Sequence, residues 1–318
     1  MVVWRLSDGL AVQRFGERGH TAPICSLAFS PDSRTLISGS ADNTAIIWSV
    51  DNGRLISRLE GHRETVDRVI YTSDGSLVVT VSSNYSAIKF WDARSGMPLC
   101  TFQHRWRIDD LLLSLEGSKL AVPMDRGVAL YEAGSRGPIV QLGIVNAPSS
   151  AKISSTALSP DGDRLFVSYN KGNSHIYSTD TCKMLLELDQ FQLAGTITSA
   201  AFSPDGGKLA VAAAHSAVPI WDLSSGEMEL HFPMDALATT IAFSPDGAFL
   251  AAAGGDAGST TSVWGFSESE GLVAEFTAPA SPIEYIKFLP DSRRLFTFMK
   301  GDKGPVCLWN VADVLRLL

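Results

Sequence analysis

Residues 24–60, ICSLAFSPDSRTLISGSADNTAIIWSVDNGRLISRLE, contain four short β-prone segments separated by turn residues. The segments are ICSLAFS, TLISGS, TAIIW and RLISRLE. Pro31 presets the first central position of a tight turn and Asp32-Ser33 favours its end, so the first two segments are predicted to form an antiparallel hairpin. A second turn at Asn52-Gly53 separates the last two segments. This stretch therefore predicts one four-stranded antiparallel sheet.

The same pattern recurs along the whole chain at a period of 40 to 46 residues. One mark of the repeat is an acidic turn, which reads SPDG at three places and in related forms elsewhere. The other is an aromatic residue that closes the third β-prone segment of each unit. The seven aromatic residues are Trp48, Trp91, Tyr131, Tyr177, Trp221, Trp264 and Trp309.

The first segment of each unit, such as residues 199–203 or 240–244, is apolar or small on successive residues. We expect both faces of such a strand to be covered. Radial stacking of the sheets around an axis covers both faces and leaves only short edges. The sequence predicts an all-β fold, a seven-bladed β-propeller of four-stranded antiparallel blades, in one domain spanning residues 1–318. The expected blades span approximately residues 20–61, 62–103, 104–144, 145–189, 190–233, 234–278 and 279–310, the last closed by residues 10–15.

The repeat resembles a known family, the WD-repeat β-propellers. The resemblance is carried by Gly-His pairs at residues 19–20 and 61–62, by the SPDG turns, and by Trp-Asp pairs at 91–92 and 221–222. In that family, a His, a Ser or Thr, an Asp and a Trp of one blade form a hydrogen-bonded tetrad. The resemblance implies a complete structural tetrad in the first blade and Asn84 in place of the Asp in the second. The first tetrad would consist of His20, Ser38, Asp42 and Trp48.

Composition excludes several classes of protein. The net charge of −8 argues against nucleic-acid binding, which needs a concentrated basic surface. The four cysteines lie far apart and show no metal-ligand spacing, so we expect buried free thiols, no metal site and an intracellular location, cytoplasmic or nuclear. No apolar run is long enough to cross a membrane, and we expect no membrane association.

No catalytic site is predicted, and no cofactor. His20, His62 and His104 recur at one position of the repeat, which favours a structural role. The sequence contains no nucleophile elbow, zinc-protease motif or phosphate loop. We therefore expect a protein that is not an enzyme. The resemblance implies a scaffold that binds protein or peptide partners on the loop face around the central channel, as a monomeric propeller within a complex.

The candidate partner-binding residues are Arg105, Trp106 and Arg107. Trp106 lies outside the positions that the repeat assigns to tryptophan, and a Trp between two Arg residues has the composition of an interface hot spot. The alternative is that Trp106 packs inward and the arginines are only solvated. Tyr85 and Arg126, in neighbouring loops, are expected to extend the same patch.

Four further features of the sequence lead to predictions of their own. Residues 91–94, Trp-Asp-Ala-Arg, are similar to the WDxR ending of substrate receptors that dock on the adaptor of a cullin-type ubiquitin ligase. The chain also has the features of a module from a longer protein. At the termini, residues 2–15 predict a strand, a turn and a second strand, with residues 10–15 pairing beside 306–309. Residues 1–6 are then expected to lie loosely on the rim, and residues 311–318 to form a displaced tail or a short helix. Pro219 lacks an amide hydrogen and predicts a bulge.

Overall fold

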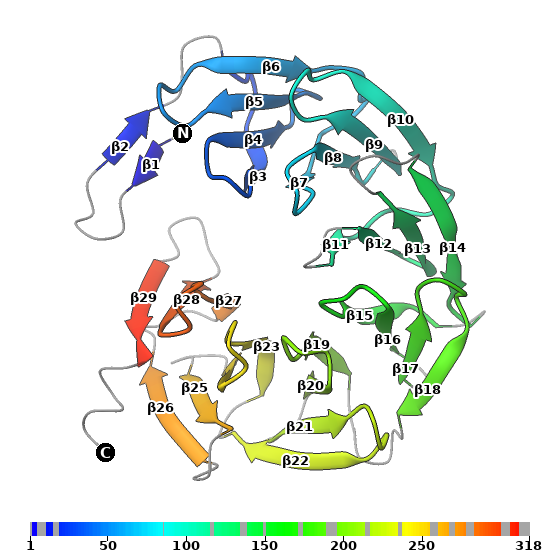
Figure 1. Cartoon of the computed structure of the whole chain (residues 1–318), viewed down its shortest axis with the longest axis vertical. Helices are drawn as coiled ribbons and strands as arrows, with labels where there is room; N and C mark the ends of the chain where they lie inside the picture. Colours follow the sequence, from blue (N-terminus) through cyan, green and yellow to red (C-terminus); the bar gives the residue numbers. More distant parts are fainter. Residues whose placement is uncertain are drawn as a thin grey trace. The chain divides into compact units, whose positions relative to one another are not determined.

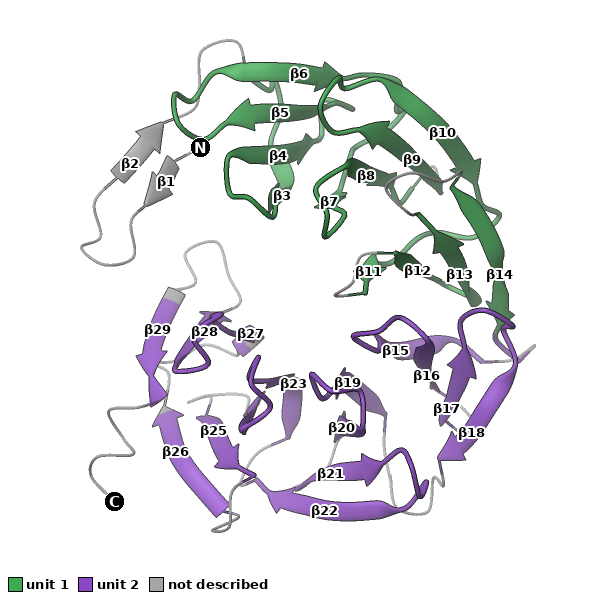
Figure 2. Ribbon diagram, in the orientation of Figure 1, with its two compact units in different colours: residues 1–146 green, residues 147–318 purple. Residues whose placement is uncertain are grey.

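The computed structural model describes most of the chain as short β-strands arranged in successive antiparallel sheets (Figure 1). The strands fall into two compact units, residues 1–146 and 147–318, which are coloured separately in Figure 2. The described residues are 2–4, 11–14, 19–84, 86–114, 118–133, 139–148, 151–170, 174–188, 196–213, 217–234, 237–254, 260–266, 271–277, 283–299 and 306–311.

Unit 1 contains one two-stranded sheet and three four-stranded sheets, which we call blades 1 to 3. In each blade the strands pair in chain order, and every pair is antiparallel. The short sheet pairs β1 (Val2–Trp4) with β2 (Ala11–Arg14). The blades consist of β3 (Ile24–Phe29), β4 (Thr35–Ser40), β5 (Ala45–Ser49) and β6 (Leu55–Leu59); β7 (Arg68–Tyr71), β8 (Leu77–Ser82), β9 (Ala87–Asp92) and β10 (Pro98–Gln103); and β11 (Leu112–Leu113), β12 (Lys119–Met124), β13 (Gly127–Glu132) and β14 (Val140–Asn146).

Unit 2 contains blades 4 to 7, and the described part of blade 7 has three strands. The seven successive antiparallel sheets confirm the all-β fold class of a seven-bladed β-propeller. The blades consist of β15 (Ile153–Leu158), β16 (Arg164–Tyr169), β17 (Ser174–Ser178) and β18 (Met184–Leu188); β19 (Ile197–Phe202), β20 (Lys208–Ala213), β21 (Ala217–Asp222) and β22 (Met228–Pro233); β23 (Ala238–Phe243), β24 (Phe249–Gly254), β25 (Thr260–Gly265) and β26 (Gly271–Thr277); and β27 (Ile283–Phe288), β28 (Arg294–Met299) and β29 (Val306–Asn310).

The acidic turns join the first and second strands of their blades, as the sequence predicts. Asp32 accepts hydrogen bonds from the Ser30 hydroxyl at 2.6 Å and from the Arg34 amide at 3.0 Å. Asp246 does the same in blade 6. The residue after the aspartate adopts positive φ, 74° at Gly247, which explains the preference for glycine there.

The core lies between consecutive blades within each unit. One cluster joins blades 1 and 2, where Ile37 and Ile47 pack with Val69 and Trp91. The second strands are the most deeply buried elements, and every residue of β8 and β12 is buried. The expectation that the first strands are covered on both faces is wrong for β3, whose residues are exposed or half-buried. The faces of a first strand are covered by packing between blades: β3 packs on β7 of blade 2, whereas β19 and β23 each pack between the first strands of two neighbouring blades.

Two smaller expectations also need correction. The structure places a register shift between Ile220 and Trp221, but blades without a proline there carry the same shift, so Pro219 does not cause it. Instead, the pairing of β20 with β21 extends from Lys208 and Asp222 to Ala210 and Ile220 and stops short of Pro219, which has no amide hydrogen to donate. The four cysteines are free, but Cys25 on β3 is exposed and the others are half-buried.

The N-terminal strands form a hairpin, with Val2–Trp4 paired to Ala11–Arg14. The expectation that residues 1–6 lie loosely is therefore wrong for the three residues of β1, because β2 supplies their hydrogen-bonding partner. The pairing of residues 10–15 with β29 and the blade boundaries remain predictions. The expected displaced tail or short helix falls mostly at residues 312–318, outside the described residues.

Candidate functional site

A chain of hydrogen bonds crosses blade 1 from a buried tryptophan to a carboxylate. The Trp48 indole N–H donates to Ser38 Oγ at 2.7 Å, and Ser38 Oγ lies 2.7 Å from His20 Nε2. His20 Nδ1 lies 2.9 Å from Asp42 Oδ2. An ionised carboxylate only accepts, so we assign the ring proton to Nδ1, and Nε2 then accepts from Ser38. The structure thus brings together all four residues of the predicted tetrad.

The surroundings of Asp42 hold its carboxylate in the ionised form. Burial alone would raise its pKa. Hydrogen bonds from the Thr44 hydroxyl at 2.7 Å, the Thr21 amide at 2.9 Å and the His20 ring outweigh burial and hold the pKa well below its usual range. Arg58 Nη1, on β6, lies 3.9 Å from the same carboxylate. Blade 1 therefore contains a paired and hydrogen-bonded negative charge in the turn between its second and third strands.

Blade 2 builds the same chain without the carboxylate. Trp91 donates to Thr80 Oγ1 at 2.8 Å, and Thr80 Oγ1 lies 2.7 Å from His62 Nε2. Asn84, at the position that corresponds to Asp42, is exposed. His62 is 8% exposed, and its Nδ1 is buried without a hydrogen-bond partner among the described residues. Burial, and to a lesser extent the charge of Lys89, lower the pKa of His62 to about 4, so the ring is neutral at pH 7.

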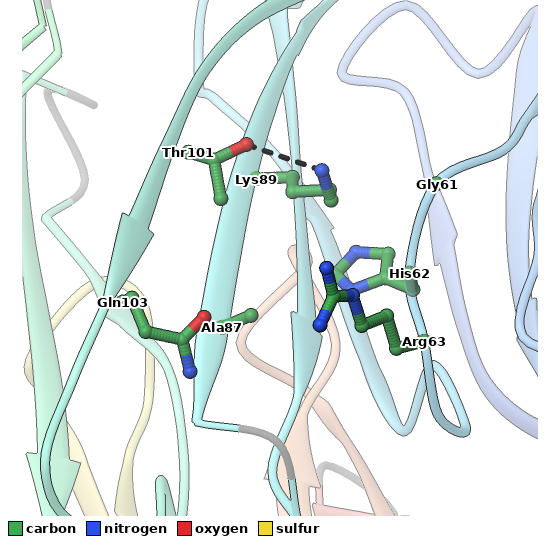
Figure 3. A pocket seen from close by; sticks show the side chains of 7 residues that line it. All are labelled: Gly61, His62, Arg63, Ala87, Lys89, Thr101 and Gln103. Carbon is green, nitrogen blue, oxygen red and sulfur yellow. Dashed lines mark hydrogen bonds between the residues drawn. The ribbon is translucent and has the colours of Figure 1, made fainter.

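His62 lines a pocket of about 260 Å³ at this end of blade 2 (Figure 3). In Figure 3, His62 and Arg63 come from the loop before β7, whereas Lys89 comes from β9. Lys89 Nζ donates to Thr101 Oγ1 at 3.2 Å and lies 5.9 Å from the centroid of the Trp91 ring. Sequence reasoning missed this pocket. The signal was a lysine inside the otherwise apolar third segment AIKFW, in the blade that lacks its aspartate.

The predicted partner-binding loop connects blades 2 and 3 at the same end of the strands. Arg105 and Arg107 are exposed, whereas Trp106 is half-buried and packs on the apolar cluster between these blades. The Asp125 amide donates to the Arg107 carbonyl at 3.2 Å, which holds the loop beside the turn that carries Arg126. Arg126 is exposed. Tyr85 lies outside the described residues.

His104 begins this loop and replaces the tetrad by a single contact. Its Nε2 hydrogen-bonds the hydroxyl of Tyr131, which stands where blades 1 and 2 have tryptophan. Burial lowers the pKa of His104 and raises that of Tyr131, so both groups stay neutral near pH 7. The loop is therefore anchored at its first residue by a side chain that reaches the interior of blade 3.

The WDxR-like segment lies at the other end of blade 2. Trp91 is buried in the tetrad-like chain, and Asp92 accepts hydrogen bonds from the Ser95 amide and hydroxyl at 2.7 and 2.6 Å. Arg94 is exposed in the turn between β9 and β10. Two of the four motif residues therefore have roles inside the blade, and the arginine is the one available for docking.

The described residues contain no cluster of three or more His, Cys, Asp or Glu side chains that could bind a metal ion. Within the same part of the chain, none of the helices reaches the length and apolar character of a membrane span.

Comparison with protein families gives the class of the repeat. Residues 12–49, 53–92, 188–222 and 230–264 match the family described as WD domain, G-beta repeat. The chain contains WD repeats. Each matched WD repeat ends at or just after the aromatic residue of a third strand, in blades 1, 2, 5 and 6. The first WD repeat begins inside β2, which places this strand where the other matched repeats have a fourth strand.

Curated relatives with WD repeats include subunits of larger assemblies. The chain is 27% identical to THO complex subunit 3 of Arabidopsis thaliana, over 65% of this chain and 65% of that protein. It is 27% identical to the guanine nucleotide-binding protein subunit beta of Nicotiana tabacum, over 71% and 52%. Autophagy-related protein 16 of Arabidopsis thaliana matches at 24% identity over 71% and 44%. The chain thus spans about half the length of these relatives.

Proposed function

We propose that this protein is a non-catalytic scaffold that binds a protein partner through the loop between blades 2 and 3. The observation that carries the proposal is the pair of exposed arginines, Arg105 and Arg107, on either side of the half-buried Trp106. Trp106 fixes the loop on the apolar cluster, so the guanidinium groups are presented from an ordered backbone. A preorganised loop loses little conformational entropy when a partner binds.

The turn that carries Arg126 extends the same surface. The hydrogen bond from the Asp125 amide to the Arg107 carbonyl joins the two loops. Arginine is enriched in interface hot spots, and its fork of N–H groups pairs with a carboxylate through two parallel hydrogen bonds. The partner surface is therefore expected to be acidic. The names of the relatives as complex subunits support a binding role of this kind.

The test replaces the two loop arginines and leaves Trp106 in place, because Trp106 contributes to packing. In an affinity purification with quantitative mass spectrometry, Arg105→Ala/Arg107→Ala should lose the partner, with binding weakened by about 2 kcal/mol or more. Arg34→Ala/Arg54→Ala is the control, because both residues are exposed and the change in net charge is the same. Equal recovery of the same partners by both double variants would refute the proposal.

The ubiquitin-ligase alternative makes a different prediction at the opposite end of blade 2. A receptor that docks through residues 91–94 should co-purify with the adaptor and lose it on Arg94→Ala. The scaffold proposal predicts that Arg94→Ala leaves the partner set unchanged. The two functions are separated by comparing Arg94→Ala with the loop double variant in one experiment.

A further inference from the structure

The pocket beside His62 lacks a group that blade 1 possesses. In blade 1, the histidine Nδ1 contacts a carboxylate at 2.9 Å. In blade 2, the corresponding Nδ1 is buried and has no partner among the described residues, although Nε2 keeps its bond to Thr80. With Thr80 donating to Nε2, as Ser38 does in blade 1, the ring proton lies on Nδ1, which is then a buried donor without an acceptor. An acceptor supplied from outside would remove the cost of leaving this donor unpaired.

Both blades also place a cationic side chain beside the site that the carboxylate occupies in blade 1, but from different strands. Arg58, on β6, lies 3.9 Å from Asp42 in blade 1. In blade 2 the strand residue that corresponds to Arg58 is Thr101, and the cation is Lys89 on β9, which contacts Thr101 Oγ1 at 3.2 Å. The cation of blade 1 therefore has a carboxylate of its own chain beside it, whereas Lys89 shares its pocket with a neutral His62.

The pocket has room for a ligand group. Its volume of about 260 Å³ is several times the roughly 30 Å³ that one water molecule occupies in the liquid. Its lining includes Arg63 as a second cation and the amide of Gln103, while the acidic residues Glu60 and Glu64 nearby in sequence are not part of it. The chemistry of the lining is therefore that of a site for a negatively charged group.

We propose that this pocket binds the side-chain carboxylate of an Asp or Glu in an acidic segment of a protein partner. The carboxylate accepts from His62 Nδ1 and pairs with Lys89, as Asp42 does with His20 and Arg58 in blade 1. A carboxylate is favoured over a phosphate because the equivalent position is filled by a carboxylate in this same chain. The inference rests on the proposed function, since the pocket lies at the end of blade 2 from which the Arg105–Arg107 loop begins.

The first experiment uses a small probe and needs no partner. N-acetyl-glutamate α-amide is titrated into the protein labelled with ¹⁵N in histidine, and the ring nitrogen signals of His62 are followed by NMR. The probe should shift the Nδ1 signal of His62 with a dissociation constant in the millimolar range. His20 is the internal control, because Asp42 already occupies its site, and its signals should not move. N-acetyl-glutamine α-amide, which has the same shape without the charge, should leave both rings unchanged.

Two variants test the site independently. Asn84→Asp, at an exposed position, places a carboxylate on the chain itself, and it should abolish the response of His62 to the probe and raise the melting temperature. Lys89→Met keeps an unbranched side chain one atom shorter and without the charge, and it should weaken probe binding at least fivefold. Inorganic phosphate is the third arm, and it should compete poorly with the glutamate probe.

Several outcomes would overturn the proposal. They are equal shifts with the glutamate and glutamine probes, an unaltered response in Asn84→Asp, or stronger binding of phosphate than of the glutamate probe. The failure of this site is distinguishable from the failure of the scaffold function. If the probe does not bind but Arg105→Ala/Arg107→Ala still loses a partner in purification, the scaffold stands and only the carboxylate pocket is refuted.

Discussion

Asp42→Ala should destabilise the protein far more than the equivalent change in blade 2. Asp42 accepts from His20, from the Thr21 amide, and from both the amide and the hydroxyl of Thr44. A hydrogen bond to a charged group nets about 1.5 to 3 kcal/mol, and a donor stranded in the interior costs about 1 to 3 kcal/mol. The Thr21 amide is exposed and regains water, so we expect a loss of about 2 to 3 kcal/mol in the free energy of unfolding.

The assay is urea denaturation followed by tryptophan fluorescence. Asn84→Ala is the matched control, and it should change the free energy of unfolding by less than about 0.5 kcal/mol, because Asn84 is exposed. Asp42→Asn should lower the free energy of unfolding by an amount between those of the two alanine variants, since it keeps the shape of the side chain and removes its charge. Because the folded pKa of Asp42 is lowered, its contribution is present above the unfolded pKa of about 4 and is lost as the pH falls below it. Equal losses for the Asp42 and Asn84 alanine variants would refute the assignment of the complete tetrad to blade 1.

Three other outcomes are expected. The pKa of His62 falls from 6.5 to about 4 on folding, so the unfolded chain takes up the proton first as the pH is lowered. The free energy of unfolding should therefore drop by up to about 3 kcal/mol between pH 6.5 and pH 4. In urea titrations at several pH values, His62→Gln should flatten this dependence. Gly254→Ala should lower the stability by about 3 kcal/mol or more in thermal unfolding, because an added Cβ would lie 1.7 Å from the Leu237 carbonyl oxygen. Gly207→Ala is the control and should be nearly neutral, because the atoms nearest to its added Cβ lie at 3.5 Å. In blade 7 the Trp309 indole N–H donates to Thr297 Oγ1 at 3.0 Å, and Thr297→Val removes this acceptor. Denaturant titration should show a loss of about 1 to 2 kcal/mol in stability, which Thr297→Ser should largely avoid.

The fold was predictable because two local signals repeat in step. An acidic turn such as the one at Asp32 and an aromatic residue such as Trp48 each fix a position within the blade, and seven copies at one period leave a single arrangement of strands. The burial of individual strands was less predictable. The segment ICSLAFS is apolar enough to suggest full burial, yet β3 has exposed and half-buried residues, because burial depends on which strands of neighbouring blades pack against it rather than on its own composition.

The candidate site was predictable only where it repeats the family pattern. His20 and Asp42 follow that pattern, and the structure places them 2.9 Å apart. Lys89 was not found, because its meaning depends on His62, in the loop before β7, and on Thr101, on β10, which meet it only after folding. The inward packing of Trp106 and the exposure of its neighbours was also undecidable from sequence, since a loop carries no periodicity. The closure of blade 7 by residues 10–15 stays a prediction, supported by the family match that begins at residue 12.

The burial of the second strands determines how the blades open to solvent. Residues of β8 and β12 are all buried, whereas the outer strands β10 and β18 alternate between exposed and half-buried positions over most of their length. Amide hydrogens exchange through local openings whose free energies are lowest where few apolar contacts must be broken. Deuterium should therefore enter blades 2 and 4 first at their outer strands, and the amides of the second strands should exchange last. A blade of this kind can release its outer strand while the interior that positions the loops remains closed.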